Sequence, residues 1–396
     1  MAGRILLITD GPAAVTYTPA LLQKLREDGF TVQVAPTAYD GVSALAFISE
    51  LALSAMSGHP CLAIDKLNLE TLKKAEAIVL APLTTMVMDI FLLGKAYALL
   101  KEAARPVIVV PATMLNAEQG NNATRYDSAL AGLPRGSRIL WAKENEKLSL
   151  GAMGELAIAS VITVNEAVYA ALETPRLAGK HVLITAGPTV EDFDPVRFIS
   201  NRSTGRMGVA LALAACRAGA CVTLVHGPLA IAIPRVLGLS CVSVRSAQEM
   251  YDAVMAKHSE ADIAILCAAV ADFRPDQCAE NKIKKADGIG LIMHLERTRD
   301  ILAELGSIPQ EERPFLVGFA AESNDVRDNA SGKLYRKHCN MLCCNDIKAP
   351  GCGFAVDTNQ ITIYYADGKI TTLPMLSKME TASRIIRAIA DEYERN

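Results

Sequence analysis

Residues 183–208 carry the arrangement of residue types that points most directly to chemistry. The segment reads LITAGPTVEDFDPVRFISNRSTGRMG: an apolar run, a break at Gly187-Pro188, and a polar loop ending in Gly205 and Gly208. An amphipathic pattern, VALALAACRAGA, follows at once and predicts a helix that stops at Gly219. Loop amides and the positive end of a helix dipole converge on one anion, so the segment predicts a phosphate site. The loop matches neither of the phosphate-binding motifs GxGxxG and GxxxxGKS. The alternative therefore stays open that the segment is an ordinary strand-to-helix turn capped by Ser and Thr.

Three further polar segments follow apolar, strand-like runs in the second half of the chain. Ligands of open α/β sheets bind where strands end, so these segments are expected to meet at one edge. Lysines neutralise phosphates and carboxylates hold Mg²⁺, so the composition of these segments predicts that they bind a nucleoside triphosphate with Mg²⁺. Asp272 is the carboxylate expected at the metal. The residues are Asp272, Phe273 and Arg274 of CAAVADFRP, with Lys282, Lys284 and Lys285 of NKIKK nearby; Phe319 and Glu322 of VGFAAES; and Asn345 and Asp346 of CCNDI.

The elements that must position these residues read as strands alternating with helices along both halves of the 396-residue chain. Such alternation predicts an α/β fold with two Rossmann-like three-layer domains built on parallel sheets. Thr174-Pro175 is the expected boundary, giving domains 1–175 and 176–396. Asp367-Gly368 between two short β-branched runs predicts a small β-hairpin near the end of the second domain.

Composition narrows the class of protein. A hydrophobic content of 51%, 21% charged residues and a net charge of −3 favour a soluble protein with large cores and disfavour nucleic acid as a partner. No signal peptide or membrane-length apolar stretch is recognised, so no membrane association and a cytoplasmic location are expected. The 10 cysteines are scattered, and the spacing of Cys339, Cys343, Cys344 and Cys352 fits no paired CxxC metal site.

Taken together in order, the motifs AGPTVEDFDPVRFISNRSTGRMG, AAVADFRP, KIKK, VGFAAES, NDI and LPMLSK resemble phosphopantothenate–cysteine ligase. This is the C-terminal half of the bifunctional coenzyme A biosynthesis flavoproteins, and the resemblance runs from about Lys180 to the C-terminus. It implies that the carboxylate of 4′-phosphopantothenate attacks the α-phosphate of CTP, releasing pyrophosphate and leaving an acyl-cytidylate. The amine of cysteine then attacks the acyl carbon, and CMP departs.

The resemblance also implies roles for individual residues. Asn201 matches the residue that stabilises the acyl-cytidylate, Arg197 the arginine associated with that step, and Lys284 the lysine that stabilises charge on the transferring phosphate. Asn201 and Lys284 are therefore expected to face one cavity. The expected nucleotide pocket consists of Gly187, Pro188, Thr189, Ser203, Thr204, Gly205, Met207 and Gly208 on its phosphate side, with Ala271, Asp272 and Phe319 on its base and ribose side.

Structural roles compete with the functional ones at several of these positions. Arg197 could pair with Asp194, and Lys285 could be a solvated surface charge, as could Lys282. Glu322 and Asp346 could cap loops instead of contacting nucleotide or Mg²⁺. The residues alone do not decide between CTP and ATP.

The first half resembles the flavin-dependent phosphopantothenoylcysteine decarboxylase in outline, so a flavoprotein-like fold is expected there. The chemical positions depart from that family: Asn68 stands at the catalytic His, Met86 and Met114 at two Asn positions, and Leu150 at the reactive Cys of the lid. Decarboxylation needs flavin oxidation of a thiol and a proton donor, and a leucine cannot donate a proton. A domain without decarboxylase activity and without FMN is the prediction.

Three functional hypotheses follow. The first is a CTP-dependent ligase with an inactive N-terminal domain, acting on phosphopantothenate and cysteine and forming a homodimer through the ligase domain or a larger homo-oligomer. The second is a fully bifunctional ligase and FMN-dependent decarboxylase. The third is a non-catalytic partner that regulates another copy of the pathway enzyme.

Overall fold

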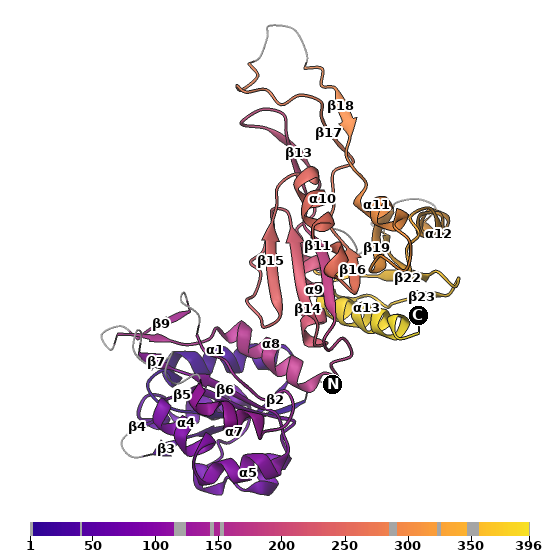
Figure 1. Cartoon of the computed structure of the whole chain (residues 1–396). Coiled ribbons are helices and arrows are strands. Elements are labelled where there is room, and N and C mark those ends of the chain that lie inside the picture. Colours follow the sequence, from indigo (N-terminus) through magenta and orange to yellow (C-terminus); the bar gives the residue numbers. More distant parts are fainter. Residues whose placement is uncertain are drawn as a thin grey trace. The chain divides into compact units, whose positions relative to one another are not determined.

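A computed structural model of the chain describes residues 3–39, 42–114, 124–142, 146–150, 154–284, 291–322, 326–346 and 356–395. Contacts divide the chain into two units, residues 1–174 with 234–236, and residues 175–233 with 237–396. In each unit helices cover both faces of a mainly parallel sheet, which confirms the predicted α/β class with parallel sheets (Figure 1).

The sheet of the first unit is parallel throughout and has the strand order β2-β1-β5-β6-β8. The first four strands are short and nearly continuous apolar runs, as expected of strands buried on both faces. Because β1 lies between β2 and β5, the chain changes direction across the sheet at the β1–β5 crevice. The strands are β1 (Arg4–Thr9), β2 (Thr31–Pro36), β5 (Ala77–Leu83), β6 (Val107–Pro111) and β8 (Arg138–Ile139).

Alternating side chains of β1 feed two separate cores. Ile5 and Leu7 pack with α1 (Ala14–Glu27), α2 (Glu50–Ser57) and α8 (Val161–Leu172). Leu6 and Ile8 pack on the opposite face. The helices there are α3 (Leu69–Lys73), α4 (Thr85–Leu92), α5 (Lys95–Ala103) and α7 (Asp127–Ala131).

Short strands also lie between residues 113 and 160, where the sequence shows no clear hydrophobic period. β7 (Thr113–Met114), β10 (Glu155–Ala157) and β9 (Lys147–Ser149) form an antiparallel sheet of their own. Strands of two or three residues are too short to show a hydrophobic period, so their formation depends on pairing with segments distant in sequence.

The second unit has an eight-stranded sheet of order β15-β14-β11-β16-β19-β20-β22-β23. Its first six strands are parallel, and the predicted hairpin β22–β23 is present and joins β20 in antiparallel fashion. The switch point lies between β11 and β16. The strands are β11 (His181–Ala186), β14 (Cys221–His226), β15 (Leu239–Ser243), β16 (Ile263–Leu266), β19 (Phe315–Glu322), β20 (Met341–Asp346), β22 (Ile361–Tyr365) and β23 (Ile370–Thr372).

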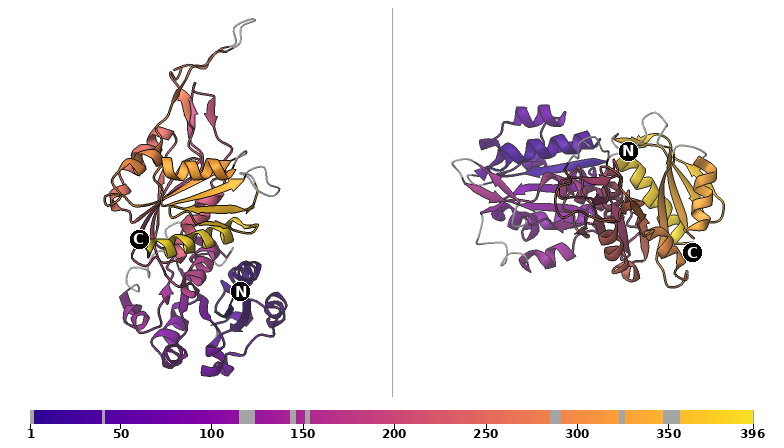
Figure 2. Two further views of the ribbon diagram at one scale, coloured as in Figure 1. Left: turned by 90° about the vertical axis from the view of Figure 1, so that its right-hand side faces the viewer. Right: turned by 90° about the horizontal axis from the view of Figure 1, so that it is seen from above.

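Two helix layers cover this sheet. α10 (Ala247–Met255), α11 (Ile301–Ser307) and α12 (Val326–Arg336) share one core with the strands. α9 (Arg206–Arg217) and α13 (Lys378–Tyr393) pack against each other on the other face (Figures 1 and 2).

Two antiparallel ribbons extend from this unit and together form what we call the arm. They are β12 (Val190–Asp192) with β13 (Phe198–Ser200), and β17 (Phe273–Pro275) with β18 (Leu295–Arg297). Both point away from the main sheet in the same direction (Figures 1 and 2). Ala279 donates its amide to the Phe193 carbonyl at 3.0 Å, which joins the two ribbons.

Within the described ranges no helix combines the length and apolarity that crossing a membrane would require.

Candidate active site

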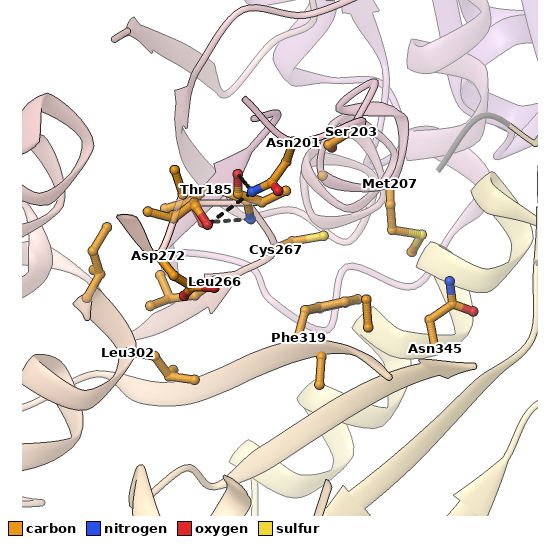
Figure 3. A pocket seen from close by; sticks show the side chains of 18 of the residues that line it. Thr185, Asn201, Ser203, Met207, Leu266, Cys267, Asp272, Leu302, Phe319 and Asn345 are labelled. Atoms are coloured by element: carbon orange, nitrogen blue, oxygen red, sulfur yellow. Dashed lines mark hydrogen bonds between the residues drawn. The ribbon is translucent and has the colours of Figure 1, made fainter. Parts of the chain in front are cut away.

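A cavity of about 790 Å³ opens at the carboxyl ends of β11, β16 and β19, directly at the switch point of the second sheet (Figure 3). This is where open α/β sheets bind their ligands. Eleven of the sequence-predicted residues line it: Asn201, Ser203, Thr204, Gly205, Met207, Gly208, Ala271, Asp272, Phe273, Phe319 and Asn345.

The N-terminus of α9 forms one wall of this cavity. Gly205 is its N-cap with φ +77° and has no side chain that could cap the first-turn amides. The first turn also contains no acidic residue. A Cβ on Gly208 would lie 2.5 Å from Ala186 Cβ, so only glycine lets α9 approach β11 this closely. The helix therefore presents its positive end to the cavity without a competing carboxylate in its own first turn.

Asn201 is held at the cavity by the AAVADFRP loop, which follows β16. Its Nδ2 donates to the carbonyl oxygens of Ala269 at 2.9 Å and Val270 at 3.1 Å. The side chain thus ties the loop before α9 to the exit of β16, two segments about 70 residues apart in sequence.

Gly187, Pro188 and Thr189 lie beneath the cavity and are not among its lining residues. Gly187 takes φ +77° in the turn after β11, and Pro188 bridges to Ala269. Thr189 is fully buried, and its Oγ1 accepts the Ala271 amide at 2.9 Å. These residues position the lining loop, so their role in the fold is support.

Lys284 is exposed and does not line the cavity. It follows Ile283, whose amide donates to Asp194 Oδ2 at 3.2 Å, so it lies on the arm beside the β12–β13 hairpin. The expectation that Asn201 and Lys284 face one cavity is therefore not met within a single chain. The reason is the arm, which carries the NKIKK segment away from the sheet. Lys282 is exposed on the same segment.

Arg197 also lies on the arm, outside the cavity lining. Its Nε donates to Asp194 Oδ2 at 3.0 Å and its Nη2 to the Ile283 carbonyl at 3.0 Å. The Arg197 side chain and surrounding backbone amides hold the pKa of the Asp194 carboxyl well below its usual value. In this chain the geometry agrees with the structural alternative, in which Arg197 pairs with Asp194 and joins the two ribbons.

The remaining predicted contacts are placed as follows. Glu322 ends β19 and is not among the lining residues; the Asn329 amide lies 3.5 Å from its Oε2. Lys285 and the side chain of Asp346 fall outside the described part of the chain.

Sequence reasoning missed several lining residues. Arg206 and Lys378 lie at the α9 and α13 side, and Lys333 and Lys337 lie at the α12 side. Burial, and second the charge of Arg206, lower the pKa of Lys378. Lys378 is the last residue of the LPMLSK motif, but the motif does not indicate where its side chain lies. The packing of α13 against α9 brings Lys378 to the cavity.

Cys267 lines the cavity floor, where burial raises the pKa of its thiol to about 12. A thiol in that state is neutral at physiological pH and is a poor nucleophile. Among the described residues, no group of three or more His, Cys, Asp or Glu side chains could hold a metal ion.

The four departures from the decarboxylase pattern occupy structural positions in the first unit. Asn68 is the N-cap of α3 and accepts the Thr71 amide at 3.0 Å. Met86 is exposed on α4, and the Leu150 amide donates to the Gly154 carbonyl at 2.8 Å. Met114 ends β7, and its side chain falls outside the description.

A buried carboxylate closes the switch point of the first sheet. Asp10 follows β1 and is 1% exposed. Its oxygens accept the hydroxyls of Thr37 and of Thr84, the latter at 2.7 Å. The next turn contains Pro12, which has no amide to donate. Since the first βα turn is where such folds cradle a phosphate, this edge offers a negative charge where an anion would bind.

The chain resembles known proteins along its whole length. The family described as DNA/pantothenate metabolism flavoprotein C-terminal domain matches residues 177–393. The coenzyme A biosynthesis bifunctional protein CoaBC of Vibrio vulnificus is 37% identical over 98% of both chains. A cysteine/cysteine sulfinic acid decarboxylase from an unknown prokaryotic organism is 48% identical over 54% of this chain and 58% of its own. The crystal structure of a CoaBC C-terminal domain is 40% identical, covers 56% of this chain and all of that one, and has a TM-score of 0.48.

Proposed function

The chain belongs to the family of coenzyme A biosynthesis bifunctional proteins CoaBC, and on that basis we propose that its second unit ligates 4′-phosphopantothenate to cysteine at the expense of CTP. The observation that carries the proposal is the cavity at the β11–β16 switch point, which is lined by both the N-terminus of α9, with glycine as its N-cap, and Asn201. Amides at a helix N-terminus suit a polyphosphate.

The chemistry has two steps, each of which conserves atoms and charge. In the first, a carboxylate oxygen of phosphopantothenate forms a bond to the α-phosphorus, and the bond to the β-phosphate breaks as pyrophosphate leaves. In the second, the cysteine amine forms a C–N bond, CMP leaves with the electron pair of the anhydride bond, and the amine loses a proton. Asn201 is held at the loop edge where the acyl-cytidylate would lie, and the α9 amides stabilise the charge of the leaving pyrophosphate.

Lys284 takes part in this proposal through a second copy of the chain. It lies outside the cavity of its own chain, on an arm with large apolar side chains that are exposed. An arm of this composition suits a self-complementary interface, and we propose a homodimer in which Lys284 of one chain reaches the cavity of the other. The exposed apolar side chains are Val196, Phe198, Phe273, Leu291, Ile292 and Leu295.

Mg²⁺ would accompany the triphosphate, and we assign it to Asp272, one of two carboxylates among the described lining residues, since the other, Asp300, pairs with Lys337. The ion would neutralise the phosphate oxygens. The side chain of Asp272 is exposed at the cavity mouth, which suits a cation that keeps several of its own waters.

We further propose that the first unit has lost decarboxylation and does not bind FMN. Asp10 presents a buried negative charge at the edge where the flavin phosphate would lie, so the residues present do not fit that group. Leu150 has no thiol, and Asn68 is engaged as a helix cap. The alternatives are the complete bifunctional activity of the family and a regulatory, non-catalytic role.

A nucleotide-by-substrate matrix tests the ligase. Pyrophosphate release is measured with CTP or ATP, with and without phosphopantothenate, and phosphopantothenoylcysteine is quantified with and without cysteine. We expect pyrophosphate only when phosphopantothenate is present, and the amide only when cysteine is added. Absence of pyrophosphate under every condition would favour the regulatory role and refute the ligase proposal.

A further inference from the structure

The first side chain of α9 is paired with a carboxylate from a distant segment of the same unit. Arg206 begins α9 and lines the cavity, and its Nη1 donates to Oδ1 of Asp357. Asp357 is not among the lining residues, and its side chain is 83% exposed. A negative charge therefore lies at the positive end of α9, although it belongs to a residue 151 positions away in sequence.

Three positive groups lie together at this wall of the cavity. A guanidinium at the start of a helix opposes the helix dipole, and the first turn of α9 contains no acidic residue to offset it. Lys378, which is 8% exposed, lines the same cavity. Burial lowers the pKa of Lys378, the charge of Arg206 lowers it further, and the carboxylate of Asp357 opposes both. Asp357 thus acts as the counter-ion to a group of like charges.

The backbone around Asp357 is tied to the start of α13. Its carbonyl oxygen accepts the amide of Lys378 at 2.9 Å. The next residues form β21 (Thr358–Asn359), which pairs with β24 (Leu376–Ser377), the strand directly before α13. These contacts hold the backbone of Asp357 in place whether or not its carboxylate contacts Arg206.

Another arginine of this unit shows how a carboxylate that fixes its partner differs from Asp357. Arg197 donates through Nε to Asp194 at 3.0 Å, and the Asp194 side chain is 0% exposed. Water is excluded from that carboxylate. The carboxylate of Asp357 is in contact with water, and ion pairs of this exposed kind are weak and are screened by salt. Asp357 is therefore a partner that Arg206 can exchange for another anion.

We propose that Asp357 is an internal competitor of the nucleotide: it pairs with Arg206 while the cavity is empty, yields the guanidinium to the triphosphate, and takes it back as pyrophosphate leaves. The inference rests on the proposed function, which places the triphosphate at the start of α9. A bound polyphosphate puts a second anion beside the same guanidinium, and two anions on one cation repel each other. Asp357 thereby weakens the binding of pyrophosphate and speeds its release, and product release limits turnover in many enzymes.

The test measures the dissociation constant of inorganic pyrophosphate by calorimetry on the full-length protein. Asp357→Asn removes the charge at nearly constant shape and keeps the backbone carbonyl that accepts the Lys378 amide. We expect this variant to bind pyrophosphate about fivefold more tightly than the wild type, with the gain reduced at high salt. Asp357→Glu keeps the charge and is expected to match the wild type. If Asp357 instead orients Arg206 toward the phosphate, Asp357→Asn binds pyrophosphate more weakly.

Arg206→Gln supplies the second half of a double-mutant cycle. It is expected to weaken pyrophosphate binding about tenfold, because it removes a cation from the cavity wall. In this background Asp357→Asn is expected to change the dissociation constant by less than about twofold, since the two side chains act through each other. Glu260→Gln is the matched control: it removes one negative charge from an exposed ion pair with Lys257, outside the cavity lining, and is expected to leave binding unchanged.

The outcomes separate this inference from the proposed function. Tighter pyrophosphate binding by Asp357→Asn that disappears in the Arg206→Gln background, without turnover in the wild type, supports the competition and refutes the ligase. Equal or weaker binding by an Asp357→Asn protein that folds by circular dichroism overturns the inference, even with wild-type ligation intact. The inference is also overturned if the tighter binding persists without Arg206, or if the wild type does not bind pyrophosphate.

Discussion

At the scale of single residues, the cations around the second unit differ in what surrounds them. Lys378 is buried at the cavity, and its pKa is lowered by that burial, whereas Lys284 is exposed on the arm. A solvated lysine interacts weakly with a phosphate until water is excluded from both. Lys284 therefore needs a covering surface before it acts on a transition state, and the arm of a dimer supplies one in the proposed mechanism.

Complementation between two inactive variants tests this placement. Lys284→Gln and Asn201→Ala are each expected to lower ligation by about 100-fold or more, because Lys284 would stabilise charge on the transferring phosphate and Asn201 the acyl-cytidylate. If Lys284 acts on the partner's cavity, co-expression of the two variants restores one intact site in each mixed dimer, or about a quarter of wild-type activity for random pairing. The measurement is pyrophosphate release by the purified mixture.

Lys257→Gln is the control, since Lys257 is a surface lysine paired with Glu260 at 3.3 Å, and full activity is expected of it. Wild-type turnover by Lys284→Gln would remove Lys284 from the mechanism. A mixture as inactive as its components would contradict action across a dimer.

At the scale of elements, the start of α9 decides how the cavity is built. Gly205 and Gly208 allow the helix to begin against the end of β11, and the loop before it is fastened by Asn201 to the exit of β16. Glycine at the N-cap position supplies no side-chain oxygen to the first-turn amides. The first-turn amides are then available to an anion.

Two glycine-to-alanine substitutions distinguish the steric effect of a Cβ between α9 and β11 from the higher helix propensity of alanine. Gly208→Ala places a Cβ against Ala186 and is expected to destabilise the fold by about 1–3 kcal/mol and to abolish the rise in melting temperature caused by CTP. Gly332→Ala lies within α12 with no atom within 4 Å of its Cβ, and is expected to stabilise by about 0.5–1 kcal/mol with the CTP effect unchanged. Denaturant unfolding and thermal shift measure both; a Gly208→Ala protein with unaltered stability and CTP response would show that α9 tolerates displacement.

At the scale of the whole molecule, two similar sheets present opposite charge at their switch points. In the first unit Asp10 ties the ends of β1, β2 and β5 together through two threonine hydroxyls. In the second unit the corresponding edge is an open cavity walled by helix amides and cations. Sheet topology alone therefore does not determine what a switch point binds, since the residues at the strand ends decide it.

The flavin content of the purified protein tests the proposal that Asp10 prevents the first unit from binding FMN. The purified chain is expected to be colourless, to take up no FMN on incubation, and to release no CO₂ from phosphopantothenoylcysteine, because a buried carboxylate repels the flavin phosphate. Cysteine and cysteine sulfinate are assayed in parallel, given the relative named for those substrates. Stoichiometric flavin in the visible spectrum, or CO₂ release from any of these three substrates, would contradict the proposed loss of decarboxylase activity.

The layers of this protein follow from local patterns in its amino-acid sequence: apolar runs of β-branched residues, helical periods and Gly or Pro breaks predict the parallel sheets, the β22–β23 hairpin and α9. The sequence also placed eleven residues that line the cavity, because they follow strand ends in the chain and carboxyl ends of parallel strands share one edge. Only the tertiary structure decided the rest. That Lys284 and Arg197 lie on the arm and that Lys378 is buried at the cavity depends on packing between segments distant in sequence, which no local pattern encodes.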